Sequence, residues 1–312
     1  MRLYRIKLRP LSPWRTPWQA DTLSGLLCCA CARVSGGDVL RAEILEPALA
    51  DRPPFVLSDA FPGDLLPLPT AARLADWPPA DRARLKRARW LDPLAFATFQ
   101  CTGSLAPGNL QDFQPVKEAT STHNTLDRIS DATGPPGSLF SRREWLLARN
   151  FDHVSLYARV ADGFLDPLVA LLRALASTGF GADVSTGRGQ FDLLGDPEPQ
   201  DHLDAPPDGA NGLIALSTFQ PAPDDPADGL WEPIVKFGKL GPDFGIENVF
   251  KRPLILFRPG ASFRSTAPRD FLGRAIPSTE LLAPDTCHAL AQRGIHPVHF
   301  AFGLTVPARL NL

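Results

Sequence analysis

The amino-acid sequence predicts an α+β fold built from two domains. Its 312 residues are about twice the ~150 residues of a typical domain. Over the first 195 residues, segments with the two-residue period of strands alternate with segments that have helical spacing. The chain also contains 33 prolines, and an interior proline removes a helical hydrogen bond and clashes with the preceding turn. These features argue against a helical bundle or a coiled coil, and no apolar run is long enough to span a membrane.

The first elements follow from short-range patterns. Residues 2–9 alternate apolar and basic side chains, which predicts a half-buried strand with a basic outer face. Asp21 is positioned to N-cap a helix that continues to Arg33 and ends at a pair of glycines. Five prolines between residues 53 and 69 predict irregular or edge structure.

The rest of the first half continues the alternation. The expected elements are a mostly helical stretch at 80–99 broken near Pro93, two strands flanking a loop at 131–137 within 117–147, a strand at 151–160, a helix at 165–177 and a strand at 189–194. The resulting order of strand, helix, hairpin-like insert, strand, helix and strand suits a ferredoxin-like domain over residues 1–195.

The second half is expected to be β-rich. Residues 196–210 are acidic and proline-rich, which predicts a linker. Residues 211–312 then form a C-terminal domain with long loops and little helix, at most at 279–292. Its strand-like runs are 212–219, 253–258 and 298–306.

The charge is unevenly distributed although the net charge is only −2. Residues 1–18 hold five basic side chains and no acid, whereas residues 192–232 hold ten acids and no Lys or Arg. Residues 236–274 hold eight basic residues and three acids. Basic tracts attract a phosphate backbone, and we expect the acidic stretch to face away from it. The basic residues of interest in the last tract are Lys236, Lys251 and Arg252.

The cysteines indicate a reducing compartment. The first residues lack the apolar core of a signal peptide, so we expect a cytoplasmic protein with reduced thiols. Cys28 and Cys31 have C-x-x-C spacing, but no second pair completes a zinc site, and they lie in an apolar helical stretch. We therefore interpret them as small buried hydrophobic residues and predict neither a metal nor a cofactor.

A glycine-rich segment at 179–191 is the most unusual motif. Four glycines in eleven residues allow positive φ and expose backbone N–H groups, and such a concavity binds phosphate. The spacing matches neither nucleotide-binding fingerprint, so nucleotide hydrolysis is poorly supported. The alternative is a tight connection between a helix and a strand. The candidate RNA-binding residues here are Gly179, Gly181, Ser185, Thr186, Gly187, Arg188 and Gly189.

The expected hairpin carries a polar strand at residues 120–129. His123, Asn124 and Arg128 are able to hydrogen-bond bases or phosphates, although an ordinary polar edge strand has a similar composition. His123 or Asp127 is chemically suitable as the base of a ribonuclease, but no convincing second catalytic group accompanies either one. We predict no catalytic residue.

Several segments, taken in order, resemble a known family. They are Asp21-Thr-Leu, the Asn124–Arg128 segment with Leu139-Phe140 after it, the glycine-rich loop, Phe250–Phe263 and His296–Gly303. Together they resemble the RAMP proteins of CRISPR systems. The chain is most similar to the Csm-type (type III-A) effector subunit four, which caps the 5′ handle of the crRNA. Where that family often has Arg before the asparagine, this chain has His123.

The resemblance implies two ferredoxin-like (RRM-like) RAMP domains, the first with the glycine-rich loop and a β-hairpin inserted at about 117–147. It implies a non-catalytic, cytoplasmic subunit for antiviral defence that binds the crRNA 5′ handle. The implied partners are the large cyclase/nuclease subunit and the backbone RAMP filament, with target RNA contacted indirectly. Two alternatives stay open: a RAMP endoribonuclease that uses His123 or Asp127, and a protein-interaction scaffold whose glycine-rich loop is only a turn.

Overall fold

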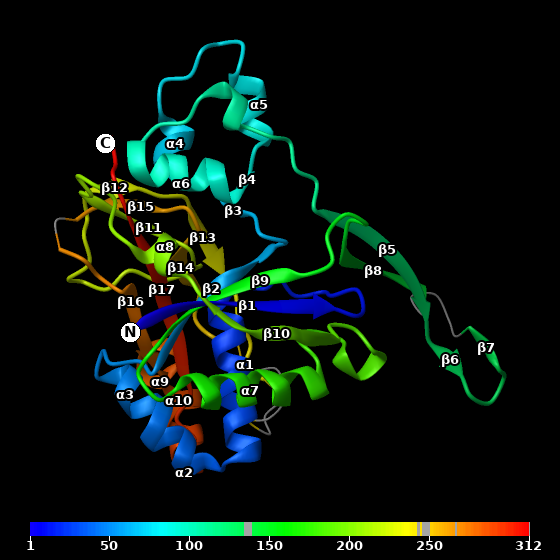
Figure 1. The fold of residues 1–312 in the computed structure, drawn as a ribbon. Coiled ribbons are helices and arrows are strands. Elements are labelled where there is room, and N and C mark those ends of the chain that lie inside the picture. The colour runs from blue at the N-terminus through cyan, green and yellow to red at the C-terminus, as the bar shows by residue number, and fades with distance from the viewer. Residues whose placement is uncertain (134–138, 242–243, 245–249, 266, 312) are drawn as a thin grey trace.

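The computed structural model describes residues 1–133, 139–241, 244, 250–265 and 267–311. Two antiparallel sheets pack with helices, and a long hairpin projects from the body (Figure 1). The expected mixture of helices and strands is confirmed. No helix among the described residues is long and apolar enough to cross a bilayer.

The first sheet is formed by strands from the first half of the chain. Its strands lie in the order β10 (Phe191–Pro199), β1 (Arg2–Pro10), β9 (Val154–Val160) and β2 (Phe55–Pro62). Helix α1 (Ala20–Val34) joins β1 to β2, and helix α7 (Leu165–Thr178) joins β9 to β10. Apart from the hairpin insert and short elements, the chain therefore runs β-α-β-β-α-β. The predicted order lacked β2, whose segment was expected to be irregular or edge structure. Strand β2, which lies within the segment of five prolines and ends at Pro62, is at the edge of the sheet, as one of the two predicted possibilities.

The second sheet has a different connection order. Its strands are β12 (Gly229–Leu230), β15 (Ser262–Arg264), β11 (Gly212–Ala215), β17 (Val298–Ala308) and β16 (Phe271–Pro277). Between the antiparallel neighbours β12 and β15 the chain forms a ribbon of β13 (Pro233–Lys236) and β14 (Leu254–Phe257). Helices α9 (Ser278–Leu281) and α10 (Pro284–Ala291) precede β17.

Shorter elements connect the strands of the first half. They are α2 (Gly37–Leu40), a π-helix (Arg41–Leu45), α3 (Glu46–Leu49), β3 (Leu66–Pro67), α4 (Thr70–Leu74), α5 (Arg82–Arg87), β4 (Trp90–Leu91), α6 (Pro93–Thr102) and a 3₁₀ turn (Pro107–Asn109). The expected helical stretch at 80–99 is thus split by β4, and Pro93 is the first residue of α6, where its missing N–H has no consequence.

The interpretation of residues 196–210 as a linker is wrong at its start. Strand β10 continues to Pro199, and helix α8 (Asp201–Asp204) follows. Prolines are tolerated in β10 because it is an edge strand. Nor does the whole acidic stretch face away from the first basic tract, because Glu198 of β10 forms ion pairs with Arg5 and Lys7 of β1. The single carboxylate of Glu198 therefore offsets part of the positive charge on β1.

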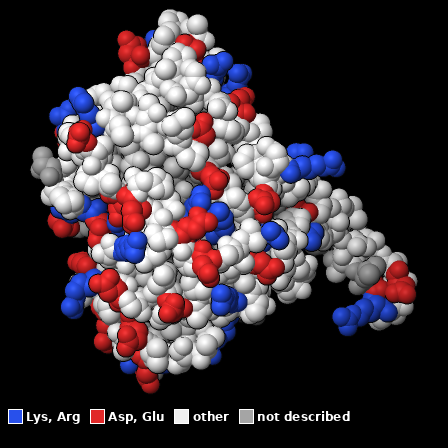
Figure 2. Space-filling view, in the orientation of Figure 1, with Lys and Arg blue, Asp and Glu red and all other residues white. Residues whose placement is uncertain are grey.

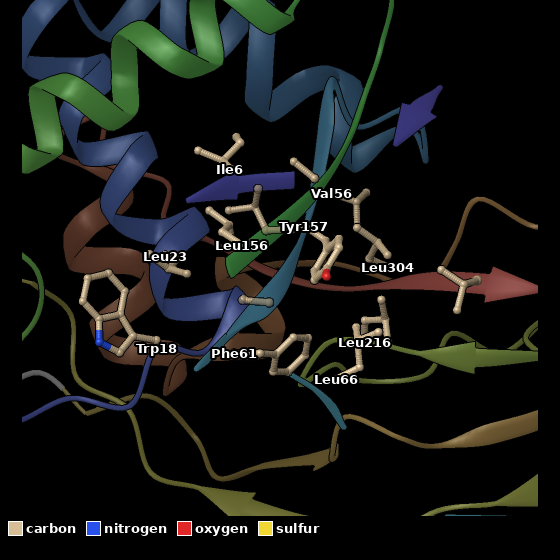
Figure 3. Packing of buried hydrophobic residues seen from close by; sticks show 14 of the residues in the cluster. Ile6, Trp18, Leu23, Val56, Phe61, Leu66, Leu156, Tyr157, Leu216 and Leu304 are labelled. Carbon is tan, nitrogen blue, oxygen red and sulfur yellow. The ribbon is translucent and has the colours of Figure 1, made fainter. Parts of the chain in front are cut away.

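One hydrophobic cluster joins the two sheets. Helix α1 contacts β2 and α7 of the first half and also β17 of the second. Leu23 of α1, Leu216 after β11 and Leu304 of β17 are fully buried in this cluster, and Figure 3 shows them with Phe61 of β2. The two halves therefore share a core, and each supplies surface that buries the other.

The start of α1 differs from the expectation. Asp21 does not N-cap the helix, which begins at Ala20 after a Gln19 that makes no side-chain cap. Instead, the backbone N–H of Ala20 donates to Oδ1 of Asp59 on β2 at 2.9 Å. The cap therefore comes from a distant strand, which leaves the Asp21 side chain available for another contact.

Candidate nucleic-acid interface

The predicted hairpin is present at the predicted place. Strand β5 (Val116–Asn124) pairs antiparallel with β8 (Leu139–Leu147), and His123 lies opposite Phe140. The short strands β6 (Leu126–Asp127) and β7 (Ala132–Thr133) form its far end (Figure 1). Part of the loop expected at 131–137 lies outside the described residues. The hairpin extends well beyond the body and so exposes both of its faces.

One face of the hairpin carries an aromatic and basic ladder. The His123 ring stacks on Phe140 with centroids 5.7 Å apart and an interplanar angle of 14°. The guanidinium of Arg142 lies 4.8 Å from the centroid of the same Phe140 ring. Ser121 Oγ, opposite Arg142 in the register, is 2.9 Å from Nε2 of His123. Flat rings beside a guanidinium are a surface on which unpaired bases stack.

The far end of the hairpin is polar and exposed. Asn124 Nδ2 donates to Oγ1 of Thr133 at 3.3 Å, and Arg128 lies exposed in the turn. Oδ1 of Asp127 accepts the backbone N–H of Ile129 at 2.9 Å, and this hydrogen bond lowers the pKa of Asp127. Asp127 thus stabilises the turn through its own backbone.

The glycine-rich loop is folded tightly onto the segment that follows β1. At Gly189, where φ is +68°, a Cβ would lie 1.9 Å from the carbonyl oxygen of Phe180. At Gly181 a Cβ would lie 2.5 Å from the side chain of Thr16. The chain therefore approaches itself at distances that only glycine allows. Within the candidate set, Gly179 and Gly189 are buried, whereas Ser185, Thr186 and Gly187 are exposed.

Many backbone N–H groups of this loop already have acceptors. Gly189 donates to the carbonyl of Pro13 at 2.9 Å, Ala182 to Oγ1 of Thr16 at 2.9 Å, and Gly187 to the carbonyl of Val184 at 3.0 Å. The loop is therefore held mainly by internal hydrogen bonds, and its outer turn presents hydroxyl groups more than a row of free amides.

A set of ion pairs fastens the loop to the root of the hairpin; we call it the root clamp. Asp183 of the loop accepts hydrogen bonds from both Arg15 and Arg142. Nε of Arg188 donates to Oε2 of Glu144 on β8 at 2.7 Å. Partial burial opposes ionisation of Asp183, but the two guanidinium groups outweigh it and lower its pKa. The clamp therefore links the glycine-rich loop to strand β8 of the hairpin.

Arg188 was among the RNA-binding residues predicted from the sequence, whereas Arg142 was not. Arg188 is engaged by Glu144, so its charge holds the loop in place. The contribution of Arg142 depends on Phe140, two residues away on the same face of β8, and on Asp183. The alternation of β8 predicts the contact of Arg142 with Phe140, because residues two apart in a strand share a face. It does not predict the contact with Asp183.

Two of the three basic residues selected in the second basic tract are half-buried. Nζ of Lys236 donates to both carboxylate oxygens of Asp21 at 2.7 Å. Nζ of Lys251 lies 3.1 Å from Nδ1 of His299, and burial lowers the pKa of Lys251. Arg252 is exposed. Asp21, Lys236, Lys251 and His299 thus form a polar junction between the halves; together with Asp59 we call it the inter-half seam.

Three members of the seam, Asp21, Asp59 and His299, are buried, whereas Lys236 and Lys251 are half-buried. The side chain of Asp21 is 1% exposed, and Nε2 of the buried His299 lies 3.3 Å from its Oδ2, at an angle outside hydrogen-bond geometry. Asp59 accepts hydrogen bonds from the N–H groups of Ala20 and Thr218, yet its burial raises its pKa to about 6. The seam joins α1 and β2 to the second half through charge and hydrogen bonding.

The outer surface has no single basic track on the side shown in Figure 2, where acidic and basic side chains are interspersed over the body. Among the described residues, no group of three or more His, Cys, Asp or Glu side chains is arranged to hold a metal ion. Cys31 is buried and Cys28 is half-buried; neither forms a disulfide. The hairpin and its loop are therefore the best-defined candidate interface.

No protein-family model matches the sequence, and no curated protein matches it significantly. Solved structures of the same fold do match. A chain of the "Csm1-Csm4 cassette in complex with pppApA" superposes with a TM-score of 0.61 at 19% identity, over 100% of this chain and 99% of that one. A chain of the "Csm3-Csm4 subcomplex in the type III-A CRISPR-Cas interference complex" gives 0.62 at 12% identity, over 99% and 100%. The chain therefore shares its fold with chains of these Csm assemblies.

Proposed function

We propose that this chain is a non-catalytic subunit of a type III-A CRISPR interference complex that binds the 5′ handle of the crRNA. We further propose that it bridges the large cyclase/nuclease subunit and the backbone RAMP filament. The full-length match to chains from a Csm1–Csm4 cassette and a Csm3–Csm4 subcomplex supports the assignment of the partners. The observation that carries RNA binding is the root clamp, because it aligns the hairpin ladder with the glycine-rich loop.

The proposed surface suits a single-stranded RNA. Bases would stack on Phe140 and His123, while the exposed Arg128 would face phosphates. The hydroxyl groups on the outer turn of the loop would supply hydrogen bonds to the backbone. Such a site needs no helix that enters a groove and no strongly basic net charge.

The endoribonuclease alternative is less well supported by the geometry. His123 hydrogen-bonds Ser121 and stacks on Phe140, and Asp127 is occupied by the backbone of its own turn. A general base needs a partner that protonates the leaving group, and neither residue has a second acid or base positioned beside it among the described residues. We therefore expect purified protein to leave repeat-derived RNA intact; cleavage that His123→Ala abolishes would establish the alternative.

RNA binding is tested by comparing two neighbouring positions on opposite faces of β8. Phe140→Ala removes a stacking ring, which is worth about 1–3 kcal/mol per base, so we expect repeat RNA to bind about tenfold more weakly. Leu139→Ala, at an apolar residue that is 63% exposed on the other face, is the matched control. Equal affinities of the two variants, measured by fluorescence anisotropy on the full chain, would refute the proposed surface.

A further inference from the structure

A cleft of about 300 Å³ lies between the first sheet, α4 and the loop after β14. The candidate RNA-binding residues do not line it. Its walls combine basic and aromatic side chains with buried polar groups. The lining includes three arginines, two carboxylates and three aromatic rings: Arg73, Arg89, Arg258, Asp59, Glu232, Trp18, Phe61 and Trp90.

Positive charge exceeds negative charge around this cleft. Arg73 has one carboxylate partner, Glu232, at 3.3 Å, and its Nη2 donates to the carbonyl of Ala88. The guanidinium groups of Arg89 and Arg258 make no hydrogen bond or ion pair with any residue that the structure describes. Burial lowers the pKa of Arg73, and the like charge of Arg89 acts in the same direction. An anion between these side chains would relieve that repulsion.

The other wall is aromatic. Trp90 is half-buried and packs edge-on against Phe61 with ring centroids 5.8 Å apart. Guanidinium groups bind phosphate oxygens in pairs, and an indole face accepts a base. The volume is at the lower end of the range for small-molecule sites, ~300–1,000 Å³, which suits one nucleotide. From this combination we infer that the cleft binds a nucleoside phosphate, with the phosphate between Arg73 and Arg89 and the base against Trp90.

The same nucleotide chemistry has two sources, a free mononucleotide or one nucleotide of a bound RNA. The chain connects the cleft to the candidate interface over a few residues, because Thr16 holds the glycine-rich loop whereas Trp18 and Gln19 line the cleft. Trp18 also stacks on Phe180 of the loop with centroids 4.1 Å apart. The RNA source rests on the proposed function, but the mononucleotide source does not.

The test titrates the full chain with AMP, with inorganic phosphate, and with short RNAs that carry a 5′ phosphate or a 5′ hydroxyl. Arg89→Gln removes one exposed guanidinium, and we expect it to weaken the binding of AMP, of RNA or of both at least about tenfold. Arg87→Gln, two residues away on α5 and 65% exposed, is the matched control and should bind as the wild type does. Calorimetry supplies the dissociation constants.

The outcomes separate this inference from the proposed function. Loss of AMP binding in Arg89→Gln supports the cleft even if Phe140→Ala leaves RNA binding unchanged. Loss of RNA binding alone assigns the nucleotide to the RNA, and a preference for the 5′-phosphorylated RNA would identify its end. Inorganic phosphate that binds as tightly as AMP would overturn the role of Trp90. If AMP and RNA bind equally well to wild type and Arg89→Gln, or AMP does not bind and RNA binding is unchanged, the inference is wrong.

Discussion

The inter-half seam and the root clamp are each built around a carboxylate that faces two basic side chains, yet their surroundings differ. Asp21 of the seam is 1% exposed beside Lys236, whereas Asp183 of the clamp is 21% exposed between Arg15 and Arg142. A buried ion pair is costly to break because the remaining charge stays desolvated, whereas water screens a partly exposed pair. The seam therefore mainly stabilises the fold, whereas the clamp mainly positions a surface.

The largest effect is expected in the seam. Asp21→Asn would leave the ammonium of Lys236 without its carboxylate, and we expect the free energy of unfolding to fall by about 3–5 kcal/mol. Urea denaturation measures this change. Asp228→Asn is the control, because Asp228 is 73% exposed beside Arg264. A loss below about 1 kcal/mol in Asp21→Asn would remove the distinction between seam and clamp.

The second effect is a pH dependence at Asp59. Its pKa is raised to about 6 by burial, so between about pH 4 and pH 6 the folded chain keeps a proton that the unfolded chain releases. The contribution of Asp59 to stability therefore falls as the pH rises through this window, by up to about 1.4 kcal/mol per pH unit.

The pH effect is isolated by comparing the wild type with Asp59→Asn, which resembles the protonated carboxyl group. We expect the variant to gain stability relative to the wild type between pH 4 and pH 7, by about 2–3 kcal/mol in total. Urea denaturation at a series of pH values measures the difference. A difference that is constant with pH would show that Asp59 does not titrate in this range.

The third effect tests the packing that supports the clamp. Gly189→Ala places a Cβ against the carbonyl oxygen of Phe180 at positive φ, and we expect it to destabilise the fold by about 2 kcal/mol. Gly187→Ala, also at positive φ but facing open space, should lower stability by about half as much. Thermal unfolding compares the two, and equal losses would mean that the close approach at Gly189 contributes nothing.

The smallest effect on stability is expected at the clamp itself. Asp183→Asn should lower the free energy of unfolding by less than about 1 kcal/mol, because solvent reaches the site. If the proposed function is right, RNA affinity should nevertheless fall severalfold, since the loop is no longer fastened to Arg142. The matched control is Glu118→Gln, which also removes a carboxylate, but one whose ion pair is with Arg143 of the neighbouring hairpin strand and not with the loop. A stability loss as large as that of Asp21→Asn would contradict the comparison.

Local patterns predicted the elements but not the partners of their charged side chains. The alternation at residues 2–9, the helix after Asp21 and the hairpin near 117–147 all have short-range causes, namely side-chain period and turn residues. The pairing of Lys236 with Asp21 spans 215 residues, and no periodicity encodes such a contact. For the same reason, Lys236 and Lys251 were selected as RNA ligands although burial places them in the seam.

Contacts between distant parts of the sequence also affect how the chain folds during its synthesis. Strand β1 pairs with β10, which lies nearly two hundred residues later in the chain, and Asp21 pairs with Lys236, which lies 215 residues after it. A ribosome releases the N-terminus first, so α1 emerges with its apolar face exposed until β17 appears, and its carboxylate is unmatched until Lys236 of β13 appears. Contacts this distant in sequence form slowly. Completion of this core is therefore a late event in the synthesis of these residues, because β17 follows every strand that it contacts in the chain.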